Sequence, residues 1–192
     1  MEKERKEGGL GMEALKMEML EEEVYTVRDI YALPDGKRAE LIDGQVYDMA
    51  PPSRTHQRLV HFFDRTIGNY IQSKGGGCEV YPAPFAVFLS DDDQNYVEPD
   101  ISVICDVSKL DEKGCHGAPD WVIEVVSPSS KRMDYFRKLF KYNSAGVREY
   151  WIVDPLKELV TVYNFEQETM EQYAFGEEVP AEIFEGFVIS IR

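Results

Sequence analysis

Residues 121–154 constrain the fold of this chain most strongly, because they combine a buried strand, a helix and a second strand. The run 121–127 is almost continuously apolar, which is typical of a central strand covered on both faces. A helix-like stretch follows over 131–145 and stops at Gly146, and a new strand begins with the letters E-Y-W-I-V-D. Strand, helix and strand in this order predict a crossover unit with two parallel strands.

The remaining patterns place further strands around this unit. Asp43-Gly44 between two alternating runs predicts a hairpin over 38–50, and apolar residues at three- and four-residue steps predict an amphipathic helix that ends at 75–77. A short helix is expected near 26–33, strands over 79–89, 96–105 and 187–191, and a second hairpin over 159–174. The sequence therefore predicts an α/β (α+β) fold, a mixed β-sheet flanked by helices, in one domain over 23–192 that follows a charged, flexible tail over 1–22.

Charge and cysteine content limit the classes of function. The formal net charge of -15 argues against a general nucleic-acid coating role, because such binding depends on Lys and Arg at phosphates. The stretch 131–148 is an exception, since it holds six basic residues and only one acid, Asp134. Cys78, Cys105 and Cys115 lack a metal-binding or disulfide-framework spacing, so we expect reduced thiols in a cytoplasmic protein. No apolar run is long enough for a membrane span.

Two acids and a lysine form the candidate site. If the strands at 100–105 and 121–127 are neighbours, Asp100 and Glu124 can project into one site, where two carboxylates about 4 Å apart repel by about 4 kcal/mol. A proton or a cation must compensate them, and carboxylates with water are the ligands that Mg²⁺ accepts. Lys138 lies four residues from Asp134 and from Tyr142, so the three share a helix face that could point back at the sheet.

Each of these residues also has a purely structural interpretation. Asp100 could be an exposed acid at a sheet edge, and Lys138 could belong to a solvated helix face. Glu124 fits this interpretation less well, because alternation places it opposite Ile123 and Val125 within the most apolar run of the chain. His56 stands near the start of the long helix and could face the site or simply pack there.

The motifs in this order resemble the Uma family of restriction-endonuclease-like proteins, within the PD-(D/E)XK nuclease superfamily. The resemblance rests on Glu-Pro-Asp before an apolar strand, A-P-D-W-V-I-E-V-V-S-P-S-S, D-x-x-x-K-x-x-x-Y, A-G-V-R-E-Y-W-I-V-D-P, the hairpin A-E-L-I-D-G-Q-V and P-P-S-R-T-H-Q. It covers about residues 25–192. It implies a restriction-endonuclease-like fold and hydrolysis of DNA phosphodiester bonds that depends on Mg²⁺ or Mn²⁺.

The resemblance also assigns roles to individual residues. It implies that Asp100 and Glu124 hold the metal, with Glu40 as an additional acidic ligand. Our own hypothesis adds His56 in an assisting role, because it stands near the start of the long helix. The superfamily pattern has a lysine two residues after the second acid, where this chain has Val126. A basic residue of the following helix replaces it in some superfamily members, and Lys138 is the corresponding residue here.

Other functions remain open at this point. The net charge and the missing lysine at position 126 would also suit a non-catalytic binding or partner module that keeps the nuclease fold. The same metal chemistry would serve hydrolysis of another phosphate ester. A homodimer would suit a double-strand cutter, which usually pairs two sites, and the exposed hairpins offer an interface.

Overall fold

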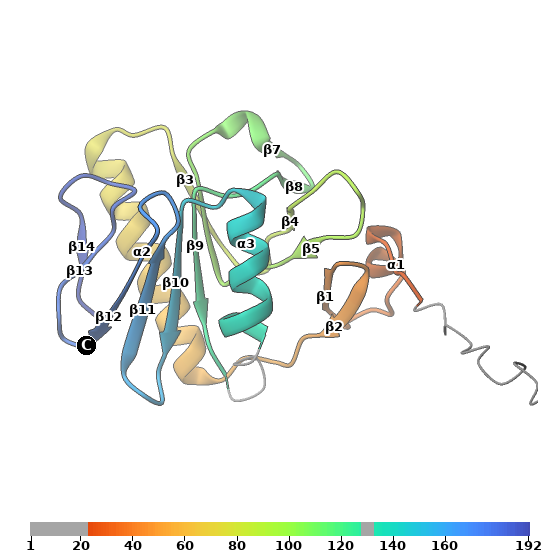
Figure 1. Ribbon diagram of the computed structural model, residues 1–192, viewed down its shortest axis with the longest axis horizontal. Coiled ribbons are helices and arrows are strands. Elements are labelled where there is room, and N and C mark those ends of the chain that lie inside the picture. Colours follow the sequence, from red (N-terminus) through yellow and green to blue (C-terminus); the bar gives the residue numbers. More distant parts are fainter. Residues whose placement is uncertain (1–22, 128–132) are drawn as a thin grey trace, which may run out of the picture.

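The computed structural model describes residues 23–127 and 133–192 (Figure 1). The tail predicted for 1–22 lies outside the described residues, as do the first two residues of the predicted 131–145 helix. In the described part, no helix is both long and apolar enough to cross a membrane.

The structure has two six-stranded sheets, and the one with the longer strands is called the larger sheet. Its strand order is β12-β11-β10-β9-β6-β3, with β9 (Trp121–Val125) near the centre. β10 (Glu149–Asp154) runs parallel to β9, as the strand–helix–strand pattern predicts. The other pairs are antiparallel, and β9 pairs with β6 (Ile101–Ile104), so the expected adjacency of these two strands is confirmed. The remaining strands of this sheet are β3 (Glu79–Pro82), β11 (Leu159–Asn164) and β12 (Thr169–Ala174).

Two helices pack on opposite faces of this sheet. α2 (Arg54–Lys74) buries an apolar stripe that includes Phe63 and Ile67 against one face, begins at the cap Ser53 and ends at Gly75 in the left-handed conformation. On the other face, Tyr142 of α3 (Leu139–Ala145) joins a second core cluster. α3 continues directly from a π-helical turn, η2 (Met133–Lys138). Because both faces are covered, every residue of β9 is buried.

The smaller sheet has the order β2-β1-β5-β4-β8-β7 and lies on the α3 side of the larger one (Figure 1). Its hairpin of β1 (Ala39–Ile42) and β2 (Gln45–Asp48) is the one predicted from Asp43-Gly44. The other strands are β4 (Val87–Phe88), β5 (Tyr96–Val97), β7 (Leu110–Asp111) and β8 (Gly114–His116). Short elements complete the fold: α1 (Val27–Tyr31), the 3₁₀ turn η1 (Val107–Lys109), β13 (Val179–Pro180) and β14 (Val188–Ile189).

Two predicted strands are each divided between the sheets. The run 79–89 forms β3 in the larger sheet and β4 in the smaller one, and 96–105 forms β5 and then β6. Prolines stand at both breaks, Pro82 and Pro84 in the first run and Pro99 in the second, and a proline cannot donate a ladder hydrogen bond. As a result, Asp100 stands just before β6 at the point where the chain passes between the sheets.

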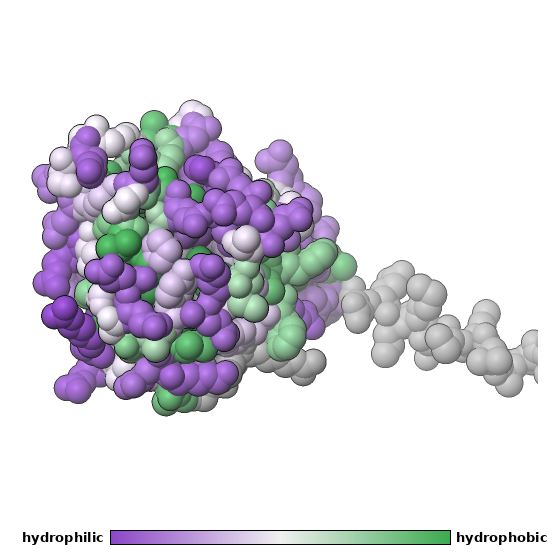
Figure 2. All heavy atoms as spheres, turned by 60° about the vertical axis from the view of Figure 1, so that its left-hand side comes forward, coloured by the Kyte–Doolittle hydropathy of each residue, from purple (hydrophilic) through white to green (hydrophobic). Residues whose placement is uncertain are grey.

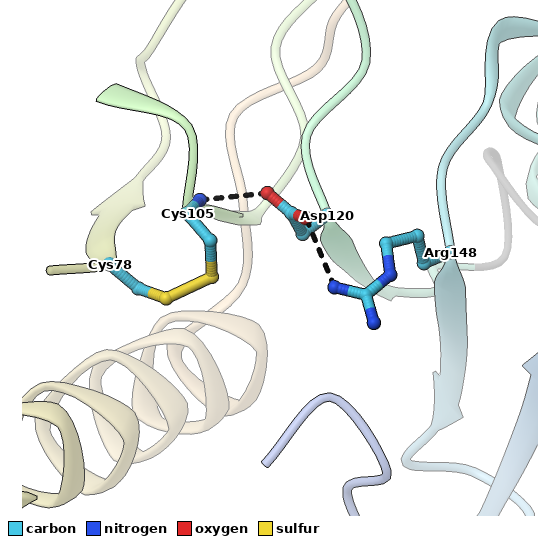
Figure 3. The surroundings of a disulfide bond; sticks show 4 residues. All are labelled: Cys78, Cys105, Asp120 and Arg148. Atoms are coloured by element: carbon cyan, nitrogen blue, oxygen red, sulfur yellow. Dashed lines mark hydrogen bonds and ion pairs between the residues drawn. A yellow bond between two sulfur atoms is a disulfide. The ribbon is translucent and has the colours of Figure 1, made fainter. Parts of the chain in front are cut away.

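The expectation of three reduced cysteines is wrong. Cys78 and Cys105 form a disulfide, while Cys115 is free and buried (Figure 3). Cys78 directly precedes β3 and Cys105 directly follows β6, and these strands pair with Glu79 opposite Ile104, so the cysteines form the next pair along the ladder. The spacing of cysteines in a sequence does not reveal such cross-strand proximity. The predicted cytoplasmic location consequently loses the support of reduced thiols.

Candidate active site

A buried carboxylate of the central strand is the starting point of the site. Glu124 is only 4% exposed and projects from β9 toward the α3 side, opposite to Ile123 and Val125, which belong to the core cluster under α2. This is the side predicted by strand alternation. A carboxylate in such surroundings requires partners, because desolvation of its charge is otherwise very unfavourable.

Lys138 supplies the compensating charge. The residue is only 4% exposed. Its ammonium group lies 2.8 Å from Glu124 Oε1 and 2.8 Å from Glu40 Oε2. Since Glu40 belongs to β1 and Glu124 to β9, this one side chain connects the smaller sheet to the larger one. The lysine comes from the last residue of the π-helical turn η2, a type of distortion that is frequent at functional sites.

Tyr142 is a second donor to the same carboxylate. Its hydroxyl group donates to Glu124 Oε1 at 2.8 Å, and its side chain is fully buried in the second core cluster. Lys138 and Tyr142 therefore both face Glu124, as their spacing of four residues predicts. Asp134 was placed on the same helix face, but its side chain lies outside the described part of the structure. Val126, at the position of the superfamily's strand lysine, is buried in the same cluster as Tyr142.

Glu40 is fixed from its other side by the segment that follows β5. The backbone N–H of Glu98 donates to Glu40 Oε1 at 3.0 Å, and the Glu98 carboxylate itself accepts from Arg38 Nε at 2.9 Å. Tyr96 OH donates to Glu98 Oε1 at 2.6 Å. Burial, followed by this bond to Glu98, raises the pKa of the Tyr96 phenol well above its usual value. The sequence patterns indicate no role for Glu98 or Arg38, although Glu98 is the first residue of the Glu-Pro-Asp motif.

Asp100 and His56 form the more accessible edge of the site. Asp100 Oδ2 accepts from the backbone N–H of Val125 at 2.8 Å and lies 3.0 Å from His56 Nε2. The backbone N–H of Asp100 is 3.5 Å from Glu124 Oε2, so the two acids are immediate neighbours. The side chains of His56 and Asp100 are 14% and 13% exposed, more than those of Glu124 and Lys138.

The structure thus brings the five predicted site residues into one continuous cluster. Its members are His56, Asp100, Glu124, Lys138 and Glu40. The other two histidines of the chain lie elsewhere: His61 is exposed on the outer face of α2, and His116 pairs with Asp111 at 3.1 Å in the β7–β8 hairpin. The roles of the five residues in catalysis and metal binding stay predictions.

The donor set can be compared with the needs of a divalent metal ion. Among residues 23–127 and 133–192, no group of three or more His, Cys, Asp or Glu side chains is arranged to hold a metal. Glu40 instead binds Lys138 through both carboxylate oxygens, at 2.9 and 2.8 Å. Asp100 and Glu124 remain as adjacent hard oxygen donors, and Mg²⁺ needs only one or two carboxylates beside its waters. The pair fits such an ion, without Glu40 as a third ligand in this arrangement.

Comparisons with known proteins agree on the class of this fold. Residues 26–192 match the model of the Uma2 family, described as "Putative restriction endonuclease". A crystal structure of "a putative nuclease" from Anabaena variabilis superposes with a TM-score of 0.71 at 20% identity, over 86% of this chain and 94% of that one. An uncharacterized protein of Synechocystis is 27% identical over 129 residues, which span 67% of this chain and 66% of that protein, just under two thirds of its length.

The family model covers nearly the whole described chain, and the structural match extends over the same two-sheet fold. The mixed α/β fold is therefore shared with the Anabaena variabilis structure. The chain belongs to the Uma2 family.

Proposed function

We propose that this chain hydrolyses phosphodiester bonds of DNA with the help of a divalent metal ion, Mg²⁺ or Mn²⁺, at Asp100 and Glu124. The observation that carries the proposal is the ammonium group of Lys138, 2.8 Å from Glu124 Oε1, although it comes from the helix and not from the strand. Two carboxylates and a lysine are the groups that metal-assisted phosphodiester hydrolysis uses. Family membership supports the same class of reaction.

The proposed metal ion would supply charge stabilisation for the phosphate and a lower pKa for water. The residues of the chain orient the reactants around it. Val125 N–H and His56 hold the Asp100 carboxylate in one orientation, with Oδ2 engaged at 2.8 and 3.0 Å. Tyr142 similarly fixes Oε1 of Glu124, so that Oε2 faces the side of Asp100.

Lys138 is the residue we assign to the phosphate or to the attacking water. Glu40 accepts from the ammonium group of this lysine within a buried site and holds it in place. A positive charge here can neutralise a non-bridging phosphate oxygen or orient a water molecule. Binding of a phosphodiester would then replace part of the lysine's contact with Glu40 or Glu124.

The test is cleavage of plasmid and of single-stranded DNA with Mg²⁺ and with Mn²⁺. Asp100→Asn, Glu124→Gln and Lys138→Met should each lower the rate by at least about 100-fold, a usual loss for a catalytic acid, base or charge. Glu149→Gln is the matched control, because Glu149 is an equally buried carboxylate of the same sheet that lies outside the site. Equal rates in all preparations would identify a contaminating nuclease and refute the proposal.

A non-catalytic binding module with the same fold is the second candidate. One observation favours it, namely that the ammonium group of Lys138 pairs with both Glu40 and Glu124 and so offsets one of their two charges. Calorimetry with Mg²⁺ and Mn²⁺ separates the two functions. An enzyme of the proposed kind should bind one of these ions, and Asp100→Asn should abolish the heat of binding. Absence of binding by the wild type would favour the module.

A further inference from the structure

The outer face of α2 carries a row of basic side chains. Arg54, Arg58, His61 and Arg65 follow one another at steps of four, three and four residues, and all four are exposed. At 3.6 residues per turn they fall within an arc of about 60°, over a length of about 16 Å. This arc lies opposite the buried face of the helix, where Phe63 and Ile67 pack on the sheet. Asp64, the one acid in the α2 sequence, lies outside it.

No Asp or Glu side chain of the described residues forms an ion pair with Arg54, Arg58 or Arg65. Arg58 donates from Nη1 to the main-chain oxygen of Arg192, the last residue described, at 3.3 Å. The side chain of Arg192 adds a further guanidinium group beside the row. In a chain with a net charge of -15, such a concentration of unneutralised positive charge stands out.

Helix stability does not explain the row. The first turn of α2 contains no acid, and its N-terminal half carries Arg54 and Arg58. Positive side chains are unfavourable there, because the partial positive charge of the helix dipole is at the same end. The position of these arginines therefore opposes the local electrostatics, and an external anion would relieve that opposition.

A hollow beside the row offers a place for such an anion. It has a volume of about 200 Å³ and lies between α2 and the last residues described, with Arg58, His61, Arg65 and Arg192 around an apolar base that includes Phe62. Figure 2 turns the side of the molecule that carries α2 and β13–β14 forward and shows hydrophilic side chains there, interrupted by small apolar areas. Cationic groups around an apolar surface suit a nucleotide, which has an anionic phosphate and a base whose flat face stacks on aromatic side chains.

The row begins at the end of α2 that also carries His56. His56, in the first turn of α2, contacts Asp100 Oδ2 at 3.0 Å, and Arg54 is two residues away along the chain. The length of about 16 Å corresponds to about five nucleotides of one strand in a duplex, at 3.4 Å each. A strand that follows the outer face of α2 would therefore arrive at the end of the helix that carries His56.

We propose that the basic row on α2, with Arg192, binds the phosphate backbone of a nucleic-acid strand and leads it toward Asp100 and Glu124. This inference rests on the proposed function for its choice of ligand. It adds a binding surface outside the buried cluster, where the strand is held by charge and not by its sequence. The expected signature is binding that weakens steeply with salt.

The test uses the full chain in the presence of a chelator, so that binding is measured without cleavage. A short fluorescein-labelled oligonucleotide is used as single strand and as duplex. It is titrated with the wild type and with the triple variant Arg54→Gln, Arg58→Gln, Arg65→Gln over a range of salt concentrations. Loss of three phosphate contacts should lower the slope of log K against log salt by about 2.7 for the duplex, and the affinity at low salt by at least about tenfold.

The matched control is the triple variant Arg28→Gln, Lys37→Gln, Lys113→Gln. These residues are exposed, lie around α1 and the β7–β8 turn away from α2 (Figure 1), and change the net charge equally. Their binding should equal that of the wild type, and circular dichroism confirms that both triple variants fold. Equal losses in the two triples, an unchanged α2 triple, or a wild type that binds neither oligonucleotide would overturn the inference.

Binding and cleavage fail separately in this design. A wild type that does not cleave DNA, but binds it through α2, refutes the proposed hydrolysis and leaves the surface in place. If cleavage depends on Asp100 and Glu124 but the triple substitution in α2 leaves binding unchanged, the proposed hydrolysis is supported and the α2 surface is refuted.

Discussion

The charged groups of the site and those on the outer face of α2 differ in where their compensation comes from. In the site, Glu40, Glu124 and Lys138 are 4–5% exposed, and the ammonium group of Lys138 lies 2.8 Å from both carboxylates. On α2, Arg54 and Arg65 are exposed and pair with no carboxylate of the described chain. The ion pairs within the site hold its side chains in one arrangement. The arginines of α2 have no such pairs with acidic side chains of the described residues, so their charge is available to an external partner.

A third region shows what burial does without a cation. Glu149 at the start of β10 is 0% exposed, and within the described residues it accepts from Trp151 Nε1 at 2.6 Å and from the Ile183 N–H at 3.1 Å but pairs with no basic side chain. Burial raises its pKa to about 7. Both glutamates belong to the same sheet, and among the described residues Glu124 has a lysine within hydrogen-bonding distance whereas Glu149 has none.

The largest effect on stability should come from removing the shared cation. Lys138→Met leaves the carboxylates of Glu40 and Glu124 buried without it, and loss of one partner of a buried ion pair costs about 3–5 kcal/mol. Urea denaturation at pH 7.5 measures the change. Arg65→Met, which removes an exposed charge from α2, should change the free energy of unfolding by less than about 0.5 kcal/mol. Similar losses in both variants would abolish the distinction between the two regions.

Next in size is the effect of pH through Glu149. Its pKa is about 7 in the folded state against the ordinary value of 4.5, so the folded protein binds the proton more tightly. The contribution to stability is complete below pH 4.5 and is lost as the pH rises toward 7, on the order of 3 kcal/mol. Glu149→Gln should therefore flatten the stability profile between pH 5 and 8.

Urea denaturation at several pH values tests this. Glu112→Gln, a change at an exposed glutamate of the β7–β8 turn, serves as the control and should keep the wild-type profile. If Glu149→Gln retains the same slope with pH as the wild type, Glu149 is not the group responsible.

The smallest of the three effects concerns a single hydrogen bond. Tyr142→Phe removes the donor at 2.8 Å from Glu124 Oε1 but leaves Lys138 in place, so the expected loss is about 2 kcal/mol, as for hydrogen bonds to charged groups. Tyr163→Phe is the control, because this half-buried tyrosine packs at the edge of the same core cluster. A loss of 4 kcal/mol or more for Tyr142→Phe would mean that Lys138 alone does not satisfy Glu124.

The sequence predicts local structure well where periodicity and capping agree. α2, the β1–β2 hairpin and β9 follow from apolar spacing, Gly75 and Asp43-Gly44. The division of 79–89 and 96–105 between two sheets was missed, because alternation continues past Pro82 and Pro99 and does not say which sheet a residue joins. The disulfide between Cys78 and Cys105 depends on the pairing of β3 with β6, and the sequence does not reveal which strands pair.

The site was predictable in part. The four-residue step from Lys138 to Tyr142 placed both on one helix face, and the resemblance to the nuclease family selected Lys138. The bond from Lys138 to Glu40 joins residues that are 98 positions apart in the sequence. It forms only because the two sheets pack together, and no local pattern predicts that packing. Arg38 and Glu98 carry no distinctive pattern in the sequence, apart from the place of Glu98 in Glu-Pro-Asp.

Lys138 joins the two sheets through Glu40 and Glu124, and this has a consequence for cleavage of the chain into two fragments. Glu40, Asp100 and His56 precede the exposed turn at Glu112–Lys113, while Glu124 and Lys138 follow it. A chain cut at that turn would yield two fragments, each with an incomplete set of charges. The complete set would exist only in the reassembled pair, so the proposed binding of a metal ion should require both fragments.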